Sequence, residues 1–200
     1  MILFVEGPRH SGKTYLVEQF INQCTDPRVE YYKFYFANHL KTLQLEWQED
    51  QPGLHYFSLG NILTILEMNQ REAYRDKIWI FDRAIISAYA WAILRGRLTH
   101  HRAYSEAQKV LSSDLYHNCK TIFVSADGQT DDNTRKKDHW DGAVKTGDES
   151  YLMLDLIQHN LYDIADSNKG NGFYSIKNTF DQAAVNFFTE SCNSALGLNK

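Results

Sequence analysis

The sequence predicts a single α/β domain in which helices cover both faces of a five-stranded parallel sheet. Short apolar runs alternate along the chain with segments whose apolar residues recur at helical intervals, which is the order of successive βα units. The run IWIF at residues 78–81 is apolar throughout, as expected of a central strand that is buried on both faces. With 200 residues and 43% hydrophobic side chains, residues 1–200 can share one core, and no linker or internal repeat divides them.

The first unit is a strand, a glycine loop and a helix. Residues 2–5, ILFV, predict a buried strand, and residues 15–21 carry apolar side chains at helical spacing. Between them, GPRHSGKT at residues 7–14 fits the pattern G-x-x-x-x-G-K-[ST] of a phosphate-binding loop. Chance would produce this pattern in roughly one in a hundred chains of this length. The strand before it and the helix after it are the setting that the motif requires.

The residue types of this loop explain its predicted chemistry. Gly7 and Gly12 allow backbone turns that other residues resist, so successive amides can point at a phosphate. Lys13 adds a positive charge for the β- and γ-phosphates, the Thr14 hydroxyl can ligate Mg²⁺, and the helix opening at Lys13 presents its positive dipole end. We expect the Lys13 side chain to be exposed to ligand rather than packed. The whole loop is predicted to bind a nucleotide: Gly7, Pro8, Arg9, His10, Ser11, Gly12, Lys13 and Thr14.

Four further strands follow. Each is a run of apolar or aromatic residues, and they are expected at residues 29–36, 78–81, 121–124 and 172–176. Right-handed crossovers between parallel strands would bring the loop after the first strand to the carboxyl edge of the sheet, where ligands bind in folds of this class.

The helices are predicted from periodicity and from capping signals. Apolar residues recur at helical intervals in four segments, at residues 59–74, 84–94, 102–115 and 151–166. The last helix is expected to open at Thr179, in a T-x-x-Q capping box with Gln182. Residues 38–57 fit either a polar helix or a loop.

Residues 128–149, GQTDDNTRKKDHWDGAVKTGDE, have little apolar content and many charges of both signs. This composition is typical of a solvated or disordered loop. Long loops in compact domains are also often functional, and a mobile lid is the second interpretation. The residues by themselves leave both open.

The segment that follows the apolar strand 78–81 narrows the class of protein. Asp82 stands where a central strand can deliver a carboxylate to the Mg²⁺ region, and its alternative role is to cap the next helix. Many motor-type ATPases place a glutamate directly after such an aspartate. Here Arg83 follows, which cannot accept a proton from water but can hold a second anion bidentately. The pair therefore favours a charged phosphoryl acceptor, unless Arg83 only pairs with a carboxylate such as Glu6.

Two segments carry a resemblance to a known family. FVEGPRHSGKT, with Glu6 before the loop, and DRAIISAYAW resemble the thymidylate kinase and deoxynucleoside kinase superfamily of P-loop kinases. Thymidylate kinases have Asp-Arg, a serine five residues after the aspartate, and Ala-Tyr at eight and nine. Asp82, Arg83, Ser87 and Ala90 match this pattern, and Trp91 stands at the place of the tyrosine. The ending, LYDIAD and FYSIKNTFDQAAVNFF, is similar to that family's last helix, strand and helix.

This resemblance implies a function for the predicted site. It implies Mg-ATP as the phosphoryl donor, Asp82 supporting the metal through water, and Arg83, with Ser87 and Trp91 nearby, at the acceptor phosphate. It also implies that residues 128–149 form a lid whose basic residues act on the transferring group, and the candidates are Arg135, Lys136 and Lys137. The expected activity is that of a (deoxy)nucleoside monophosphate kinase of thymidylate-kinase type.

Departures from the family pattern leave the acceptor open. The family's acceptor-phosphate segment, Arg-Glu-Pro-Gly-Gly, has no counterpart in FYFANHL, and its base-reading arginine would fall near Ile62. Nucleoside kinases share the R-x-x-x-S-A spacing, but they carry a carboxylate at the end of the second strand to take a proton from a sugar hydroxyl. Residues 35–38, YFAN, contain no acid. This favours a monophosphate acceptor; a nucleoside, a DNA-borne hydroxyl served by Asp82, or a nucleotide-dependent ATPase or switch are the alternatives.

Charge and cysteine content restrict partners and location. A net charge of −4 and an isoelectric point near 6.0 argue against a broad electrostatic grip on nucleic acid, so a small nucleotide is the expected partner. A homodimer is left open. The three cysteines, Cys24, Cys119 and Cys192, are far apart, which fits a reduced, cytoplasmic setting.

Membrane insertion, secretion and a histidine metal site are not expected. No apolar run approaches the ~18 residues of a membrane span. The first residues lack a basic region and are needed for the phosphate loop, so we expect no signal peptide. His100, His101 and His139 have no metal-ligand spacing and are expected at the surface.

Overall fold

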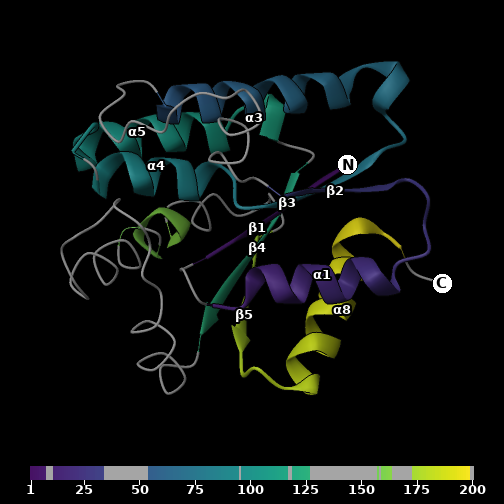
Figure 1. The fold of residues 1–200 in the computed structure, drawn as a ribbon. Helices are drawn as coiled ribbons and strands as arrows, with labels where there is room; N and C mark the ends of the chain where they lie inside the picture. Colours follow the sequence, from purple (N-terminus) through teal and green to yellow (C-terminus); the bar gives the residue numbers. More distant parts are fainter. Residues whose placement is uncertain are drawn as a thin grey trace, which may run out of the picture.

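Five parallel strands form one sheet in the order β2-β3-β1-β4-β5 (Figure 1). The computed structural model describes residues 1–7, 11–33, 54–94, 96–116, 119–126, 157, 159–163 and 173–198. The strands are β1 Ile2–Glu6, β2 Val29–Lys33, β3 Ile78–Asp82, β4 Cys119–Ala126 and β5 Phe173–Asn178. The predicted five-stranded parallel sheet is confirmed.

The strand order places the ends of β1 and β3 side by side. β1 pairs with β3 on one side and with β4 on the other, and Val5 lies opposite Asp82 in the register. From β1 the chain runs to β2 on one side of the sheet, whereas from β3 it runs past β1 to β4 on the other side. The direction in which the sheet is wound therefore changes between β1 and β3. Ligands of open α/β sheets bind at the carboxyl ends of the strands near such a change. The loop after β1 starts at this point.

Helices lie on both faces of the sheet (Figure 1). α1 Lys13–Gln23 and α8 Gln182–Leu196 lie on one face, and α3 Leu54–Gln70, α4 Ile85–Leu94 and α5 His100–Leu111 lie on the other. Short 3₁₀ turns follow α3 at Glu72–Tyr74 and α5 at Asp114–Tyr116. Residues 159–163 are helical as well, inside the predicted helix 151–166. No helix of the described ranges is long and apolar enough to cross a membrane.

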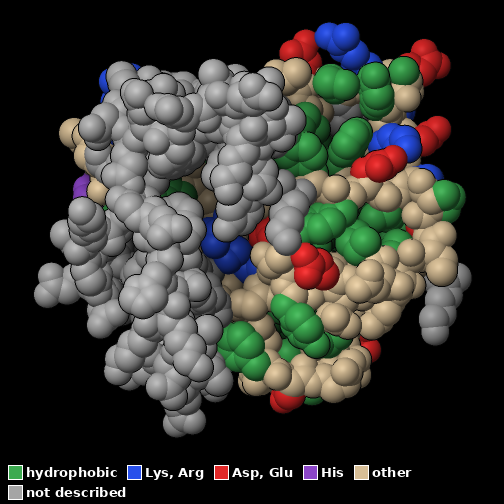
Figure 2. All heavy atoms as spheres, viewed as in Figure 1, with side chains coloured by type: hydrophobic (Ala, Val, Ile, Leu, Met, Phe, Trp, Pro, Cys, Tyr) green, Lys and Arg blue, Asp and Glu red, His purple; other side chains and the backbone are tan. Residues whose placement is uncertain are grey.

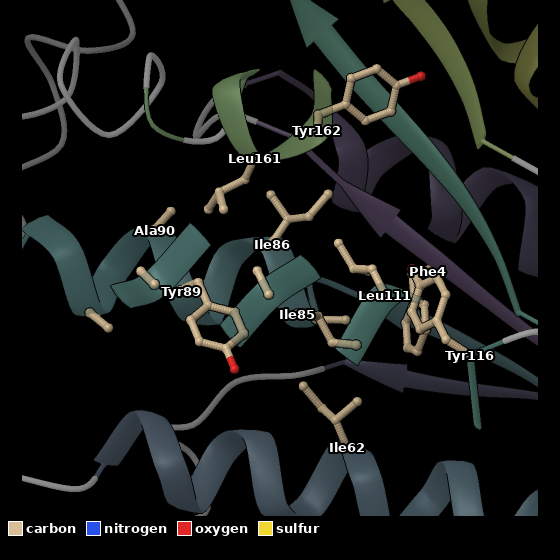
Figure 3. Packing of buried hydrophobic residues seen from close by; sticks show 14 of the residues in the cluster. Phe4, Ile62, Ile85, Ile86, Tyr89, Ala90, Leu111, Tyr116, Leu161 and Tyr162 are labelled. Carbon is tan, nitrogen blue, oxygen red and sulfur yellow. The ribbon is translucent and has the colours of Figure 1, made fainter. Parts of the chain in front are cut away.

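β1 is buried along its whole length because it packs in both layers. Leu3 and Val5 belong to the core under α1 and α8, whereas Ile2 and Phe4 belong to the core under α3, α4 and α5. This division follows from the period of two in a strand. Figure 3 shows the second core, where Phe4 lies beside Tyr116 with their ring centroids 5.4 Å apart. A central, rigid β1 is the base from which the phosphate loop starts.

Several helix boundaries differ from those predicted. The helix expected at residues 59–74 begins at Leu54 and ends at Gln70, because Arg71 takes an extended conformation that breaks it. The helix expected at residues 102–115 runs over His100–Leu111. Thr99 starts it by accepting a hydrogen bond from the Arg102 amide at 3.3 Å.

The predicted capping box of the last helix is wrong. The cap is Asp181, whose Oδ1 accepts from the Ala184 amide at 2.9 Å, and the helix begins at Gln182. Thr179 lies before this point and donates its hydroxyl to Asp181 Oδ1 at 3.0 Å. Phe180 between them has a φ of 60°, so the chain turns there and is not yet helical.

Replacing Asp181 with alanine should lower the melting temperature at neutral pH more than replacing Thr179 with alanine. The reason is that Asp181 caps α8 directly, whereas Thr179 only donates to the capping carboxylate. The Ala184 amide holds the pKa of Asp181 below its ordinary value. The cap's stabilisation is therefore present above that ordinary pKa and is lost as the pH falls through the lowered one. Thermal unfolding followed by circular dichroism at neutral and strongly acidic pH checks this, and an equal effect of both variants at neutral pH would contradict it.

Candidate active site

The two glycines of the phosphate loop are required by its backbone. Gly7 has a φ of 135°, and a Cβ there would lie 2.1 Å from the carbonyl oxygen of Val124 in β4. Gly12 has a φ of 77°, and a Cβ there would lie 2.3 Å from Nδ2 of Asn178. Both φ values favour glycine, and both positions lack room for any side chain. The predicted turns are present at both ends of the loop; Pro8, Arg9 and His10 lie outside the described residues.

α1 begins directly after the loop, with Gly12 as its N-cap residue. Gly12 has no side chain to cap the helix, and the start of a helix is a favourable place for an anion. The expectation that the Lys13 side chain is exposed is wrong, because only 3% of Lys13 is accessible. Burial raises the pKa of the Glu6 carboxyl, and the charge of the Lys13 ammonium acts against that rise.

Thr14 and Asp82 meet as expected from the ends of α1 and β3. The Thr14 hydroxyl donates to Oδ2 of Asp82. Oδ1 of the same carboxylate is buried and has no hydrogen-bond partner among the described residues. The alternative role of Asp82, capping the following helix, is filled by another residue.

That residue is Glu6, the last residue of β1. Its Oε1 accepts from the amides of Ala84 and Ile86, each at 2.9 Å, and its Oε2 accepts from the Ser87 hydroxyl at 2.5 Å. Burial raises the pKa of Glu6, although the Ser87 hydrogen bonds and the charges of Arg83 and Lys13 act in the opposite direction. Glu6 thus joins the strand before the phosphate loop to the start of α4. The sequence singled out Glu6 through the family resemblance and as a possible partner of Arg83, but not as the group that binds the start of α4.

Arg83 is held in an unusual backbone conformation between β3 and α4. It has a φ of 75°, which is uncommon outside glycine, and its amide donates to the Val5 carbonyl at 2.9 Å. Nη1 of its half-buried guanidinium is buried and has no hydrogen-bond partner among the described residues. Glu6 accepts hydrogen bonds from residues at the start of α4 and none from Nη1. A cation held in this way is ready to bind an anion from outside.

Ser87 and Trp91 lie four residues apart in α4, which places them on the same side of that helix, whereas Arg83 precedes α4 and is not helical. Ser87 is buried and donates to Glu6, so its contact with an acceptor stays a prediction. Trp91 is half-buried and packs against the core under α3, α4 and α5. Arg135, Lys136, Lys137 and the whole predicted lid lie outside the described residues, as does His139. His100 and His101 are exposed, as expected.

The residues at this site suit a hard divalent cation. Thr14 and Asp82 offer two adjacent oxygens, and the unpartnered Asp82 Oδ1 is a buried anion without a donor. Mg²⁺ typically uses one or two protein oxygens and completes its shell with phosphate oxygens and water. In the described part of the chain, no group of three or more His, Cys, Asp or Glu side chains is placed to hold a metal by itself. Figure 2 shows lysine or arginine side chains beside an acidic one near the start of α1.

Sequence reasoning missed one residue that touches the loop. Asn178, the last residue of β5, is buried and donates from Nδ2 to the carbonyl oxygen of Ser11 at 2.8 Å. The contact joins positions 167 residues apart, so no local pattern could indicate it. A polar residue at the carboxyl end of a parallel strand was the only available signal.

Comparison with known proteins places the fold. No known protein family and no curated protein matches the sequence. The structure is similar to a thymidylate kinase from Candida albicans, with a TM-score of 0.60, 15% identity and coverage of 97% of this chain and 92% of that one. It is similar to a deoxyadenosine kinase from M. mycoides solved with dCMP and dCDP, with a TM-score of 0.59, 14% identity and full coverage of both chains. A thymidylate kinase from Ehrlichia chaffeensis has a TM-score of 0.57, 16% identity and 98% coverage of each chain. The chain therefore has the fold of these kinases.

Proposed function

We propose that this protein is an ATP-dependent phosphotransferase acting on a nucleotide-type acceptor, and most specifically a (deoxy)nucleoside monophosphate kinase of thymidylate-kinase type. The observation that carries this proposal is the Arg83 guanidinium. Its Nη1 is buried and has no hydrogen-bond partner in the part of the chain that the structure describes, one residue beyond the carboxylate that binds Thr14 of the phosphate loop. A site that only hydrolysed ATP would need a group to position water there, and an arginine cannot accept water's proton.

The donor side of the reaction is assigned to the phosphate loop and α1. The loop amides and the first turn of α1 bind the phosphates of ATP, and the Lys13 ammonium neutralises their charge. The charges of Lys13, on the donor side, and Arg83, on the acceptor side, both act to lower the pKa of the buried Glu6, against the larger effect of burial. Glu6 therefore lies within electrostatic reach of both cations. Such fixed charges lower the barrier by positioning and by stabilising charge in the transition state.

Thr14 and Asp82 are assigned to Mg²⁺. The Thr14 hydroxyl donates a hydrogen bond to Asp82 and keeps its lone pairs for a cation, and Asp82 Oδ1, which has no hydrogen-bond partner among the described residues, can hold a metal-bound water. Thr14 and Asp82 would hold the ion, which would supply positive charge to offset the negative charge of the phosphates.

The acceptor side is assigned to Arg83, with Ser87 and Trp91 on the same side of α4. Arg83 binds the acceptor phosphate bidentately and orients its oxygen toward the γ-phosphoryl group. A monophosphate oxygen is already an anion and needs no base. The reaction moves the γ-phosphoryl group of ATP to this oxygen, and ADP leaves. Arg135 and Lys136 of the 128–149 segment are proposed to close over the transferring group.

Incubation with γ-labelled Mg-ATP and a panel of acceptors tests the function. The panel holds nucleosides, nucleoside monophosphates, oligonucleotides with free hydroxyl ends, and water alone. We expect label in a nucleoside diphosphate. Label in a monophosphate would identify a nucleoside kinase, label in an oligonucleotide a DNA-directed kinase, and release of phosphate alone an ATPase.

Residues 128–149 should be cut less by proteases when the proposed ATP site and the proposed acceptor site are both occupied. A lid closes over bound ligands and removes exposed backbone, so cuts in this segment should become rarer on addition of an analogue that joins adenosine to a nucleoside through a phosphate chain. Limited proteolysis read by mass spectrometry measures this, with cuts elsewhere in the chain as the internal control. Equal cutting of 128–149 with and without the analogue would assign the segment to an ordinary loop.

A further inference from the structure

The carboxyl end of β5 is tied to the phosphate loop by a single side chain. Asn178 is 1% exposed, and both ends of its amide are used. Its Oδ1 accepts from the Phe180 amide at 2.9 Å, and its Nδ2 donates to the Ser11 carbonyl at 2.8 Å. Because the Phe180 N–H can only donate, it sets which end of the Asn178 amide faces it, and the NH₂ group must face Ser11.

This bond determines how one peptide of the loop is turned. The Ser11 carbonyl and the Gly12 N–H belong to the same planar peptide group and point in opposite directions. With the carbonyl drawn toward Asn178, the Gly12 N–H points away from β5. If the peptide flipped, a carbonyl oxygen would take the place of that amide and would repel a bound phosphate. Gly12 alone cannot prevent a flip, since glycine allows many backbone conformations.

The surroundings of Asn178 hold its amide in place. A Cβ on Gly12 would lie 2.3 Å from Asn178 Nδ2 and 3.1 Å from a ring carbon of Phe180, so both side chains lie against the loop. Phe180 has a φ of 60°, and Asp181 next to it caps α8. Phe180, after β5, thus holds one end of the Asn178 amide while the other end binds Ser11.

We propose that Asn178 is a positioning residue for the phosphoryl donor, which keeps the Gly12 amide directed at the donor phosphates and the Ser11 carbonyl away from them. The proposal rests on the proposed function, because it takes the loop as the binding site of Mg-ATP. Asn178 itself touches the loop backbone and not the nucleotide.

Two variants at Asn178 and one matched control test this. Asn178→Ala removes the donor without adding charge. Asn178→Asp keeps the shape and the acceptor for Phe180 but cannot donate to Ser11, which protects the test if the alanine variant does not fold. Asn186→Asp makes the same chemical change at an exposed position of α8. The melting temperature of each variant is measured and compared with that of the wild type, so that only folded variants are used.

The first measurement is Mg-ATP binding by calorimetry, together with the KM for each substrate. We expect both Asn178 variants to bind Mg-ATP about tenfold more weakly or worse, with the acceptor KM and the Asn186→Asp variant within about twofold of wild type. The loss in Asn178→Asp should persist at high salt, which screens simple charge repulsion but does not restore the peptide orientation. A wild-type affinity in the folded variants, or equal losses for donor and acceptor, would overturn the proposal.

The second measurement needs no nucleotide. The ¹³C shift of the Ser11 carbonyl should move in both Asn178 variants and stay in place in Asn186→Asp, because only the former lose the hydrogen bond to that oxygen. An unmoved Ser11 signal would overturn the proposal even if ATP binding changed. Failure of the wild type to bind Mg-ATP would instead contradict the proposed function, and the Ser11 shift would still decide whether Asn178 holds the loop.

Discussion

Replacing Lys13 with methionine should abolish phosphoryl transfer. Methionine preserves most of the buried aliphatic stem of Lys13, which is only 3% exposed, and removes the ammonium. The donor phosphates then lose the positive charge at the start of α1, and transfer should fall by at least a thousandfold, a loss of about 4 kcal/mol of transition-state stabilisation. The label-transfer assay with the best acceptor measures this.

The burial of Lys13 makes a stability control necessary. The same Lys→Met change at Lys109, which is exposed on α5, is the matched control and should leave activity unchanged. Lys13 lies beside the buried Glu6, and removing its charge should raise the pKa of Glu6 further. Thermal unfolding of the variant separates a lost fold from a lost charge. A folded Lys13→Met protein with wild-type turnover would remove the basis of the donor assignment.

Replacing Arg83 with alanine should chiefly raise the KM for the acceptor. Loss of a charge-assisted contact costs about 1.5–3 kcal/mol, which corresponds to about a ten- to hundredfold fall in kcat/KM for the acceptor. The affinity for ATP should barely change, since the contacts proposed for ATP come from residues 7–14. Arg83→Lys should recover only part of the loss, because a point charge cannot make a bidentate contact. Steady-state kinetics with each substrate varied in turn measures both effects.

The backbone at Arg83 allows a sharper version of this test. Glycine accepts a φ of 75° without strain, so Arg83→Gly should lose acceptor binding while keeping the melting temperature near that of wild type. The exposed Arg75, replaced by alanine, is the control for loss of an arginine elsewhere. If Arg83 only stabilised the core, its variants would melt earlier and lose both affinities together. An unchanged acceptor KM in a stable Arg83→Gly protein would end its assignment to the acceptor.

Local patterns in the sequence were sufficient to predict the sheet and the glycine turns of the loop after β1. The apolar runs that became β1 and β3 identify themselves through composition, and Gly7, Gly12 and Thr14 lie within eight successive positions. Asp82 could be placed because parallel strands end at the same edge, and it does bind Thr14. Such features depend on residues that are neighbours in sequence or on the geometry of strands, and both can be read without coordinates.

Helix ends could not be decided in the same way. Thr179 and Asp181 are both good N-cap residues, and the T-x-x-Q pattern favoured the wrong one. The left-handed turn at Phe180 decides between them, and that turn depends on the Asn178 side chain accepting the Phe180 amide. Capping preferences differ by a few tenths of a kcal/mol, so one tertiary contact is enough to reverse them.

The sequence by itself determined an α/β sheet, a loop with glycine turns at both ends and a carboxylate close to that loop, because each depends on periodicity or on short spacing. The tertiary structure decided how these parts are held. Glu6 binds Ser87 across 81 positions and Asn178 binds Ser11 across 167, and both contacts are made by buried polar groups at strand ends. A buried carboxylate or amide must find partners, but the chain does not say which until the fold brings them within reach. For the same reason, only the tertiary structure shows that Lys13 is buried and that Nη1 of Arg83 has no hydrogen-bond partner among the described residues.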